Sequence, residues 1–171
     1  CVDDAGRRLL WGWLREGRST ELSVKAGWSG SQAIPRQLSL DEHHRLLMEP
    51  VSELESIRGK GYHYENVELS AQSLFEIRSL RLDMVAEFEV SDNGSLSFMV
   101  NSADSGREGT QISYDKNHAQ LAIHRTYPET INDLDHYPHI AQHDLDKAET
   151  LTLRIILDGS TLEVIANKRT S

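Results

Sequence analysis

The chain has 171 residues, enough for one ordinary domain, and its 38% hydrophobic and 26% charged residues are typical of a globular protein. Its net charge of −9 argues against nucleic acid as a partner, because binding to phosphates requires clustered Lys and Arg. It contains no run of about 18 or more apolar residues, so no membrane span is expected. Cys1 is the single cysteine, which excludes a disulfide within the chain.

The first expected elements are strands rich in apolar and aromatic residues. Residues 7–14 read Arg-Arg-Leu-Leu-Trp-Gly-Trp-Leu, which is typical of one buried strand. A polar stretch separates them from residues 33–40, where Pro35 favours an edge strand or the start of a strand. Two histidines at 43–44 then indicate a polar turn, and the apolar pattern resumes at 45–48.

A short helix is expected at residues 50–58. Pro50 suits the first position of a helix, and Val51 and Leu54 recur at helical spacing. Two glycines follow directly and would end the helix. We therefore place the boundary between two structural units in this segment.

The rest of the chain mostly alternates between apolar and polar residues, which predicts short strands. Alternating segments lie at 67–72, 86–90, 95–100, 111–114, 120–124, 151–157 and 161–165. The Asn-Gly at 93–94 and the Asp-Gly at 158–159 predict hairpin turns, so an antiparallel sandwich is expected. A long polar loop is expected at 127–146. Residues 167–171 read as another turn, which predicts an incomplete sheet with an unpaired edge.

Three histidines, His136, His139 and His143, are spaced as metal ligands on one helix face would be. Pro138 interrupts any such helix and no cysteine lies nearby, so surface positions are the better explanation and no metal site is expected. The sequence also lacks a Gly-x-Ser-x-Gly nucleophile motif and a phosphate-binding glycine loop. We expect no cofactor.

Trp11, Trp13 and Glu16 are candidates for contacts with a sugar. Aromatic faces stack on sugar rings, and a carboxylate accepts hydrogen bonds from hydroxyl groups. A strand also buries part of its side chains, so a core position is favoured for at least one of the two tryptophans. Most other acidic residues, such as Glu87 and Glu89, lie at outward strand positions where solvation is a sufficient explanation.

Three segments are specific through their order and spacing: residues 6–13, residues 27–36 with Gly-Trp-Ser-Gly and Ile-Pro-Arg, and residues 50–58 with Pro-Val-Ser-Glu-Leu-Glu and Arg58. Together they resemble glycoside hydrolase family 32, the invertases, inulinases, levanases and fructosyltransferases. Residues 157–167 resemble the family's late hairpin. The resemblance implies an all-β chain: the last strands of a five-bladed β-propeller followed by a C-terminal antiparallel β-sandwich. By that comparison, the units are residues 1–48, a connector at 49–59, and the sandwich at 60–171.

The resemblance also implies a retaining mechanism. The family places its Asp nucleophile in a Trp-x-Asn-Asp-Pro motif, a stabilising Asp in Arg-Asp-Pro and its acid/base Glu in Glu-Cys-Pro. None of these motifs occurs here, so no catalytic residue is assigned and the chain alone is expected to be inactive. We expect part of a β-fructofuranosidase-type enzyme that hydrolyses sucrose or fructans, or transfers fructose, and that binds its substrate through an upstream propeller. Secretion is expected ahead of a cytoplasmic or vacuolar location.

Two other functions stay open at this point. The sandwich could be a non-catalytic carbohydrate-binding module, for which Tyr62, Tyr64, Tyr127 and Tyr137 are the available aromatic platforms. Alternatively, it could mediate a homo-oligomer, since an unfinished sheet edge can pair with a second copy.

Overall fold

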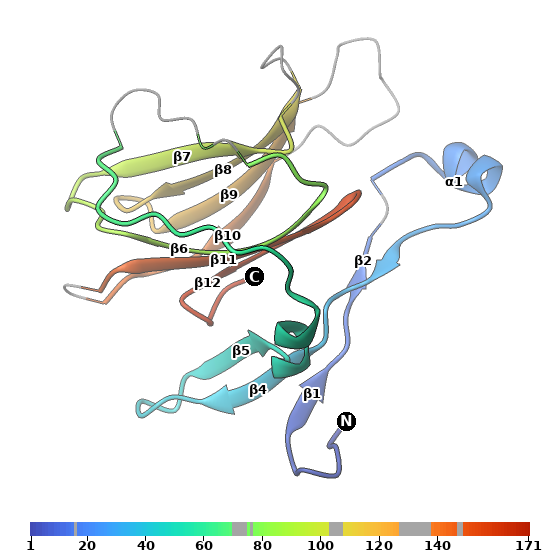
Figure 1. Ribbon diagram of the computed structural model, residues 1–171, viewed down its shortest axis with the longest axis horizontal. Coiled ribbons are helices and arrows are strands. Elements are labelled where there is room, and N and C mark those ends of the chain that lie inside the picture. Colours follow the sequence, from blue (N-terminus) through green and yellow to red (C-terminus); the bar gives the residue numbers. More distant parts are fainter. Residues whose placement is uncertain (16, 70–74, 76, 103–107, 127–137, 147–148) are drawn as a thin grey trace.

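The computed structural model describes the 171 residues except 16, 70–74, 76, 103–107, 127–137 and 147–148. The chain is mostly β, as expected. Two facing sheets form a sandwich, and residues 1–50 form an extended arm beside it (Figure 1). A short helix lies at the far tip of this arm. Neither described helix has the length or the apolar character that a membrane crossing requires.

The arm consists of two small antiparallel sheets. In the first, β4 (Arg36–Leu40) lies between β1 (Arg8–Leu10) and β5 (Leu46–Pro50); in the second, β2 (Trp13–Leu14) pairs with β3 (Ser31–Gln32). The single strand predicted at 7–14 is therefore wrong. Pairing with β4 ends at Leu10 and pairing with β3 begins at Trp13. Between them, the Gly12 carbonyl accepts a hydrogen bond from the Ala33 amide at 3.0 Å.

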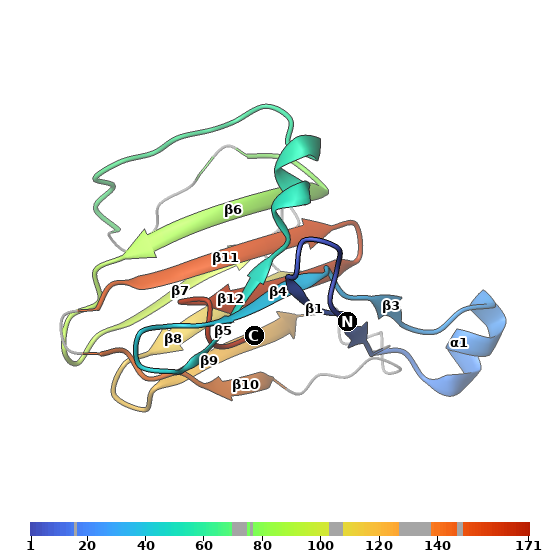
Figure 2. The ribbon, with the colours of Figure 1, turned by 90° about the horizontal axis from the view of Figure 1, so that it is seen from below.

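Helix α1 (Thr20–Ala26) forms the tip of the arm and was not predicted (Figure 2). Ser19 caps its N-terminus, accepting a hydrogen bond from the Leu22 amide at 3.3 Å, and Gly27 ends it in the left-handed conformation. Ser23 is its one buried residue, so the helix lacks the apolar stripe that makes a helix visible in a sequence.

The connector contains a 3₁₀ helix, η1 (Ser52–Ile57), rather than the helix predicted from residue 50. Pro50 is instead the last residue of β5, paired with Arg36. Val51 is still extended, and its amide donates to the Pro35 carbonyl at 3.0 Å. This continuation of the sheet delays the helix by two residues.

The sandwich has sheet orders β10-β9-β8-β7 and β12-β11-β6. Its strands are β6 (Arg81–Phe88), β7 (Ser95–Val100), β8 (Gly109–Asp115), β9 (Gln120–Thr126), β10 (His139–Gln142), β11 (Leu151–Asp158) and β12 (Thr161–Ala166). The hairpin at 158–159 is confirmed. The hairpin at 92–94 is wrong, because that turn passes the chain from β6 in one sheet to β7 in the other.

Two further predictions in this region fail. Residues 67–69 form no strand and have exposed side chains, while 70–72 lie outside the described residues. The segment expected to be a loop at 127–146 contains β10, which pairs with β9. At the other sheet, β12 is an edge strand: among the described strands it has a ladder with β11 alone.

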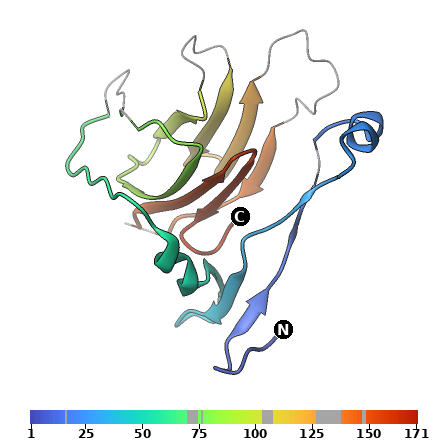
Figure 3. The same cartoon turned by 45° about the vertical axis from the view of Figure 1, so that its right-hand side comes forward.

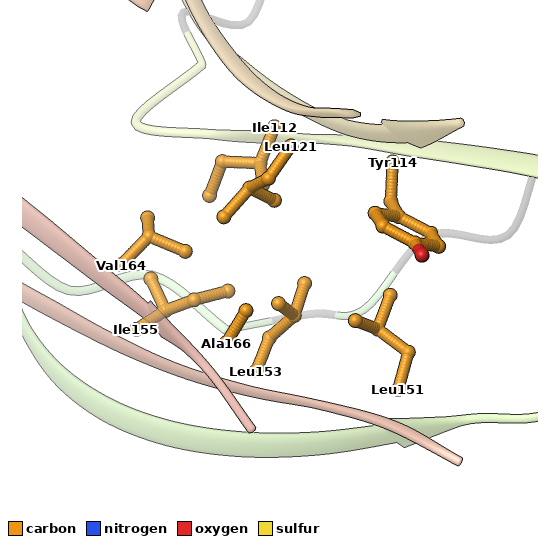
Figure 4. Close-up of a cluster of buried hydrophobic side chains, with 8 residues drawn as sticks. All are labelled: Ile112, Tyr114, Leu121, Leu151, Leu153, Ile155, Val164 and Ala166. Carbon is orange, nitrogen blue, oxygen red and sulfur yellow. The ribbon is translucent and has the colours of Figure 1, made fainter. Parts of the chain in front are cut away.

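The core lies between the two sheets (Figure 4). One sheet contributes Ile112, Tyr114 and Leu121. The facing sheet contributes Leu151, Leu153, Ile155, Val164 and Ala166. Alternate residues of β11 and β12 thus point into the core, which leaves Glu163 on the outer face of its sheet.

Candidate functional site

All three tryptophans of the chain lie in the arm, and all three are exposed. The exposed fractions are 51% for Trp11, 65% for Trp13 and 52% for Trp28. The expected core position for Trp11 or Trp13 is therefore wrong in this chain. Exposed indole rings on one arm are a surface that can stack on a sugar ring.

Trp13 and Trp28 border a hollow of about 660 Å³ at the base of α1. Its wall also includes Arg18 and Ser23. The Arg18 guanidinium lies 4.1 Å from the centroid of the Trp28 ring, in the geometry of a cation–π contact. Aromatic faces with hydrogen-bond donors beside them suit a polyhydroxylated ligand. The lining residues do not include Trp11.

The position of Trp13 depends on Gly30. Residues Trp13 and Leu14 pair with Gln32 and Ser31, which brings the indole ring over the segment that enters β3. Gly30 has φ 71°, and a Cβ at that position would lie 2.5 Å from Trp13 Nε1. Glycine is needed here both for the backbone conformation and for the space that the ring occupies.

Glu163 of the sandwich supports the arm. Oε1 accepts a hydrogen bond from the Ile34 amide, and Oε2 accepts one from the Arg36 guanidinium, both at 2.7 Å. The Glu163 side chain is only 5% exposed. A buried carboxylate needs such partners, and here both partners belong to the arm.

Further polar contacts join the same parts. The Met48 amide donates to the Lys168 carbonyl at 2.6 Å, and Lys168 Nζ lies 2.8 Å from Glu49 Oε1. On the connector, Arg58 lies 2.8 Å from Asp83. Burial alone would raise the pKa of Asp83, but hydrogen bonds from Arg154 and Arg58 outweigh it and lower that pKa.

Comparison with known proteins identifies the family. Residues 53–171 match the family described as "Glycosyl hydrolases family 32 C terminal", and residues 1–50 match "Glycosyl hydrolases family 32 N-terminal domain". The chain belongs to glycosyl hydrolase family 32. The resemblance in the sequence is thereby confirmed.

Curated relatives include "Beta-fructofuranosidase, insoluble isoenzyme 4" of Oryza sativa subsp. japonica, 42% identical over 89 residues, and "Fructan 1-exohydrolase" of Bromus pictus, 38% identical over 89 residues. Each match covers 50% of this family 32 chain and 15% of the relative, so the chain spans a small part of these enzymes.

The fold matches that of fructan 1-exohydrolase IIa from Cichorium intybus, with a TM-score of 0.81 and 22% identity over 99% of this chain and 40% of that chain. A variant of that enzyme, in complex with 1-kestose, has a TM-score of 0.79 at the same identity and coverage. With the two family matches, this similarity confirms the predicted fold class: the end of the family 32 propeller followed by the C-terminal sandwich.

The other candidate residues of this family 32 chain are not brought into one site. Glu16 lies outside the described residues, as do His136, Tyr127 and Tyr137. The other two candidate tyrosines, Tyr62 and Tyr64, are exposed and precede β6. Among residues that the structure describes, no group of three or more His, Cys, Asp or Glu could hold a metal ion.

The surface position expected for the histidines is confirmed for His139 and wrong for His143. His139 is exposed on β10, whereas His143 is buried and its ring nitrogens contact Thr170 Oγ1 at 2.9 Å and Asn167 Oδ1 at 3.1 Å. Burial lowers the pKa of His143, against the hydrogen bond with Asn167, which raises it. A neutral His143 therefore holds the turn after β12, the turn that contacts Met48.

Sequence reasoning did not single out Arg18, Trp28 or Glu163, which the structure places at or near the candidate site. Trp28 carried a signal, since it belongs to the Gly-Trp-Ser-Gly segment of the family resemblance. Glu163 also belongs to a segment of the resemblance, the late hairpin at 157–167, but it alternates with apolar residues of β12 as a solvated strand residue would.

Proposed function

We propose that this chain is the C-terminal part of a retaining β-fructofuranosidase-type enzyme acting on sucrose or fructans. Residues 1–48 supply late propeller strands, 49–59 the connector and 60–171 the bracing sandwich. The upstream propeller carries the catalytic carboxylates and binds the substrate, so this chain alone is inactive. The names of the relatives and the 1-kestose complex of the Cichorium enzyme support this assignment.

One observation carries the proposal. The matches to the N-terminal and C-terminal family descriptions meet at residues 50–53, and polar contacts join both the arm and the connector to the sandwich. A sandwich attached in this way holds the arm in a defined position. That is the arrangement needed to close a propeller whose other strands belong to upstream polypeptide.

We further propose that Trp11, Trp13 and Glu16 contribute to the rim of the substrate pocket. Both rings are exposed in this chain, and the role requires that the upstream strands leave them accessible to a sugar in the whole enzyme. The hollow beside Trp13 adds space next to the rim. The catalytic residues themselves lie in the upstream propeller and not in these 171 residues.

The test is to express the chain together with the upstream family 32 propeller and to measure glucose release from sucrose. Activity is expected from the combination and not from the chain alone. Trp11→Ala, Trp13→Ala and Glu16→Ala should each raise KM, and unchanged KM in all three would refute the rim. Tyr62→Ala is the matched control, an exposed aromatic residue outside the arm whose loss should leave KM unchanged.

A binding-module function predicts the opposite ranking. In that case Tyr62→Ala would weaken retention on immobilised fructan, and the tryptophan variants would not. An inactive combination of properly folded parts would remove the enzyme assignment itself.

A further inference from the structure

We propose that Glu163 is a positioning residue for the tryptophan segment 11–13. Its carboxylate fixes the backbone at 34–36, and through Ala33 it sets where Gly12 and the flanking tryptophans lie. The inference rests on the proposed function, because it gives the sandwich a part in substrate binding. In this role a single side chain of the sandwich acts on the tryptophan segment through one series of contacts, from Glu163 to Ile34 and from Ala33 to Gly12.

The path begins with the two oxygens of Glu163, which have different partners. Oε1 binds a main-chain group, the Ile34 amide, and Oε2 binds a side chain, the Arg36 guanidinium. Contacts two residues apart restrain both the position and the direction of that strand. The carboxylate is 5% exposed and the Arg36 side chain 14% exposed, so water competes little for either bond.

The path continues from Ile34 to Ala33, its neighbour in sequence. Ala33 is buried, and its amide donates to the Gly12 carbonyl at 3.0 Å. A Cβ at Gly12 would lie 3.3 Å from the Ala33 Cβ, so the two backbones are already in close approach. A shift of Ala33 must therefore move Gly12, and Gly12 lies directly between Trp11 and Trp13.

The views of the arm show the same arrangement. β12, which carries Glu163, lies next to the segment leading into β4, while the tryptophan segment lies on the neighbouring strand of the arm (Figures 2 and 3). Only two steps of contact separate the sandwich from the tryptophans. Such a short route transmits a displacement without a rearrangement of the sandwich core.

The effect expected from losing this restraint is specific. Small displacements of a binding group reduce substrate affinity, whereas catalytic carboxylates on the upstream propeller keep their own geometry. Glu163→Gln keeps an acceptor for the Ile34 amide and removes the charge that holds Arg36. We expect KM for sucrose to rise roughly tenfold with kcat changed less than about twofold.

The matched control is Asp83→Asn. Asp83 is a carboxylate of the same sandwich, 17% exposed and held by Arg58 and Arg154, but its contacts lead to the connector and not to residues 33–36. It should lower the thermal midpoint by at least as much as Glu163→Gln while leaving KM unchanged. Equal KM effects from the two variants would reduce Glu163 to a structural residue and overturn the proposal.

A second readout is independent of activity. Because every tryptophan of the chain lies between residues 11 and 28, acrylamide quenching of tryptophan fluorescence in the 171-residue chain reports on the arm alone. Glu163→Gln should increase the quenching constant and Asp83→Asn should not. If Glu163→Gln does not fold, Arg36→Lys, which keeps the charge but not the planar guanidinium, should show the same two effects in smaller size.

The two readouts separate this inference from the proposed function. If the complemented wild-type enzyme were inactive while quenching still rose in Glu163→Gln, the function would be wrong and the positioning correct. If the enzyme were active and quenching and KM were unchanged in the folded variant, the positioning would be wrong.

Discussion

Replacing Leu153 with alanine tests the core of the sandwich. Leu153 is fully buried on β11, within the cluster that also contains Ile112 and Tyr114. The substitution removes apolar atoms from the space between two sheets and leaves a cavity that the paired strands cannot easily close. Because no polar group is orphaned, the cost is transfer plus cavity, about 3–4 kcal/mol of unfolding free energy.

Urea denaturation followed by far-UV circular dichroism measures this cost. With an m-value of about 2 kcal/mol per M, the midpoint should fall by about 1.5–2 M. Tryptophan fluorescence is a second probe in the same titration, because it reports on the arm alone. The contacts of Glu163 and Lys168 with the arm predict that both transitions move together.

Leu80→Ala is the control, the same substitution at a side chain that is 68% exposed. It should change the unfolding free energy by less than about 0.5 kcal/mol. A midpoint shift below about 0.5 M for Leu153→Ala would refute the assignment of a closed core. Fluorescence and dichroism transitions that separate would instead refute the attachment of the arm to the sandwich.

Three other perturbations have expected outcomes. Tyr114→Phe removes the hydroxyl that donates to the His143 carbonyl at 3.0 Å. Because the carbonyl is then a buried acceptor without this donor, the unfolding free energy measured by urea denaturation should fall by about 1–3 kcal/mol. An unchanged unfolding free energy would contradict the hydrogen bond. Burial lowers the pKa of His143 in the folded protein below the ordinary value of 6.5, so the unfolded chain binds a proton at a higher pH than the folded protein does. Stability should therefore be full above pH 6.5 and decrease as the pH falls from 6.5 toward the lower folded-state pKa, and His143→Gln should flatten this dependence of the thermal midpoint on pH. Gly30→Ala should destabilise the arm and alter tryptophan emission, because the added Cβ displaces Trp13. Gly27→Ala is the control: its φ is also positive, at 77°, but an added Cβ there meets no other atom. It should lower the unfolding free energy by only about 1 kcal/mol and leave the emission unchanged.

The sequence pattern predicted a hairpin correctly where two consecutive strands also pair with each other in space. The hairpin at 158–159 is such a case, because β11 pairs directly with β12. The turn at 92–94 has the same local chemistry, yet β6 pairs with β11, whose residues lie far along the chain. Alternation specifies which face of a strand is buried, but it does not specify the partner strand.

The candidate site was also only partly predictable from the sequence. Trp11 and Trp13 could be selected from the sequence because an aromatic pair is conspicuous, although their exposure could not be read from a run that resembles a buried strand. Glu163 lies in the segment that resembles the family's late hairpin, but that resemblance does not predict its contact with the arm. Its partner Ile34 is 129 positions away, and an acidic residue in an alternating strand is indistinguishable from a solvated one until the tertiary structure is known.

The distribution of buried residues explains why the arm needs the sandwich. Within the described part of residues 1–50, only Ser23, Ala33 and Pro50 are buried, whereas the sandwich encloses a core between two sheets. Burial in the arm is too small to offset the conformational entropy lost in ordering its backbone. Contacts outside the arm must supply the difference: those to Glu163 and Lys168 here, and those to upstream blades in the proposed enzyme. The outer face of the sandwich, which carries Glu163, and not its core, is therefore the part that holds the arm in place.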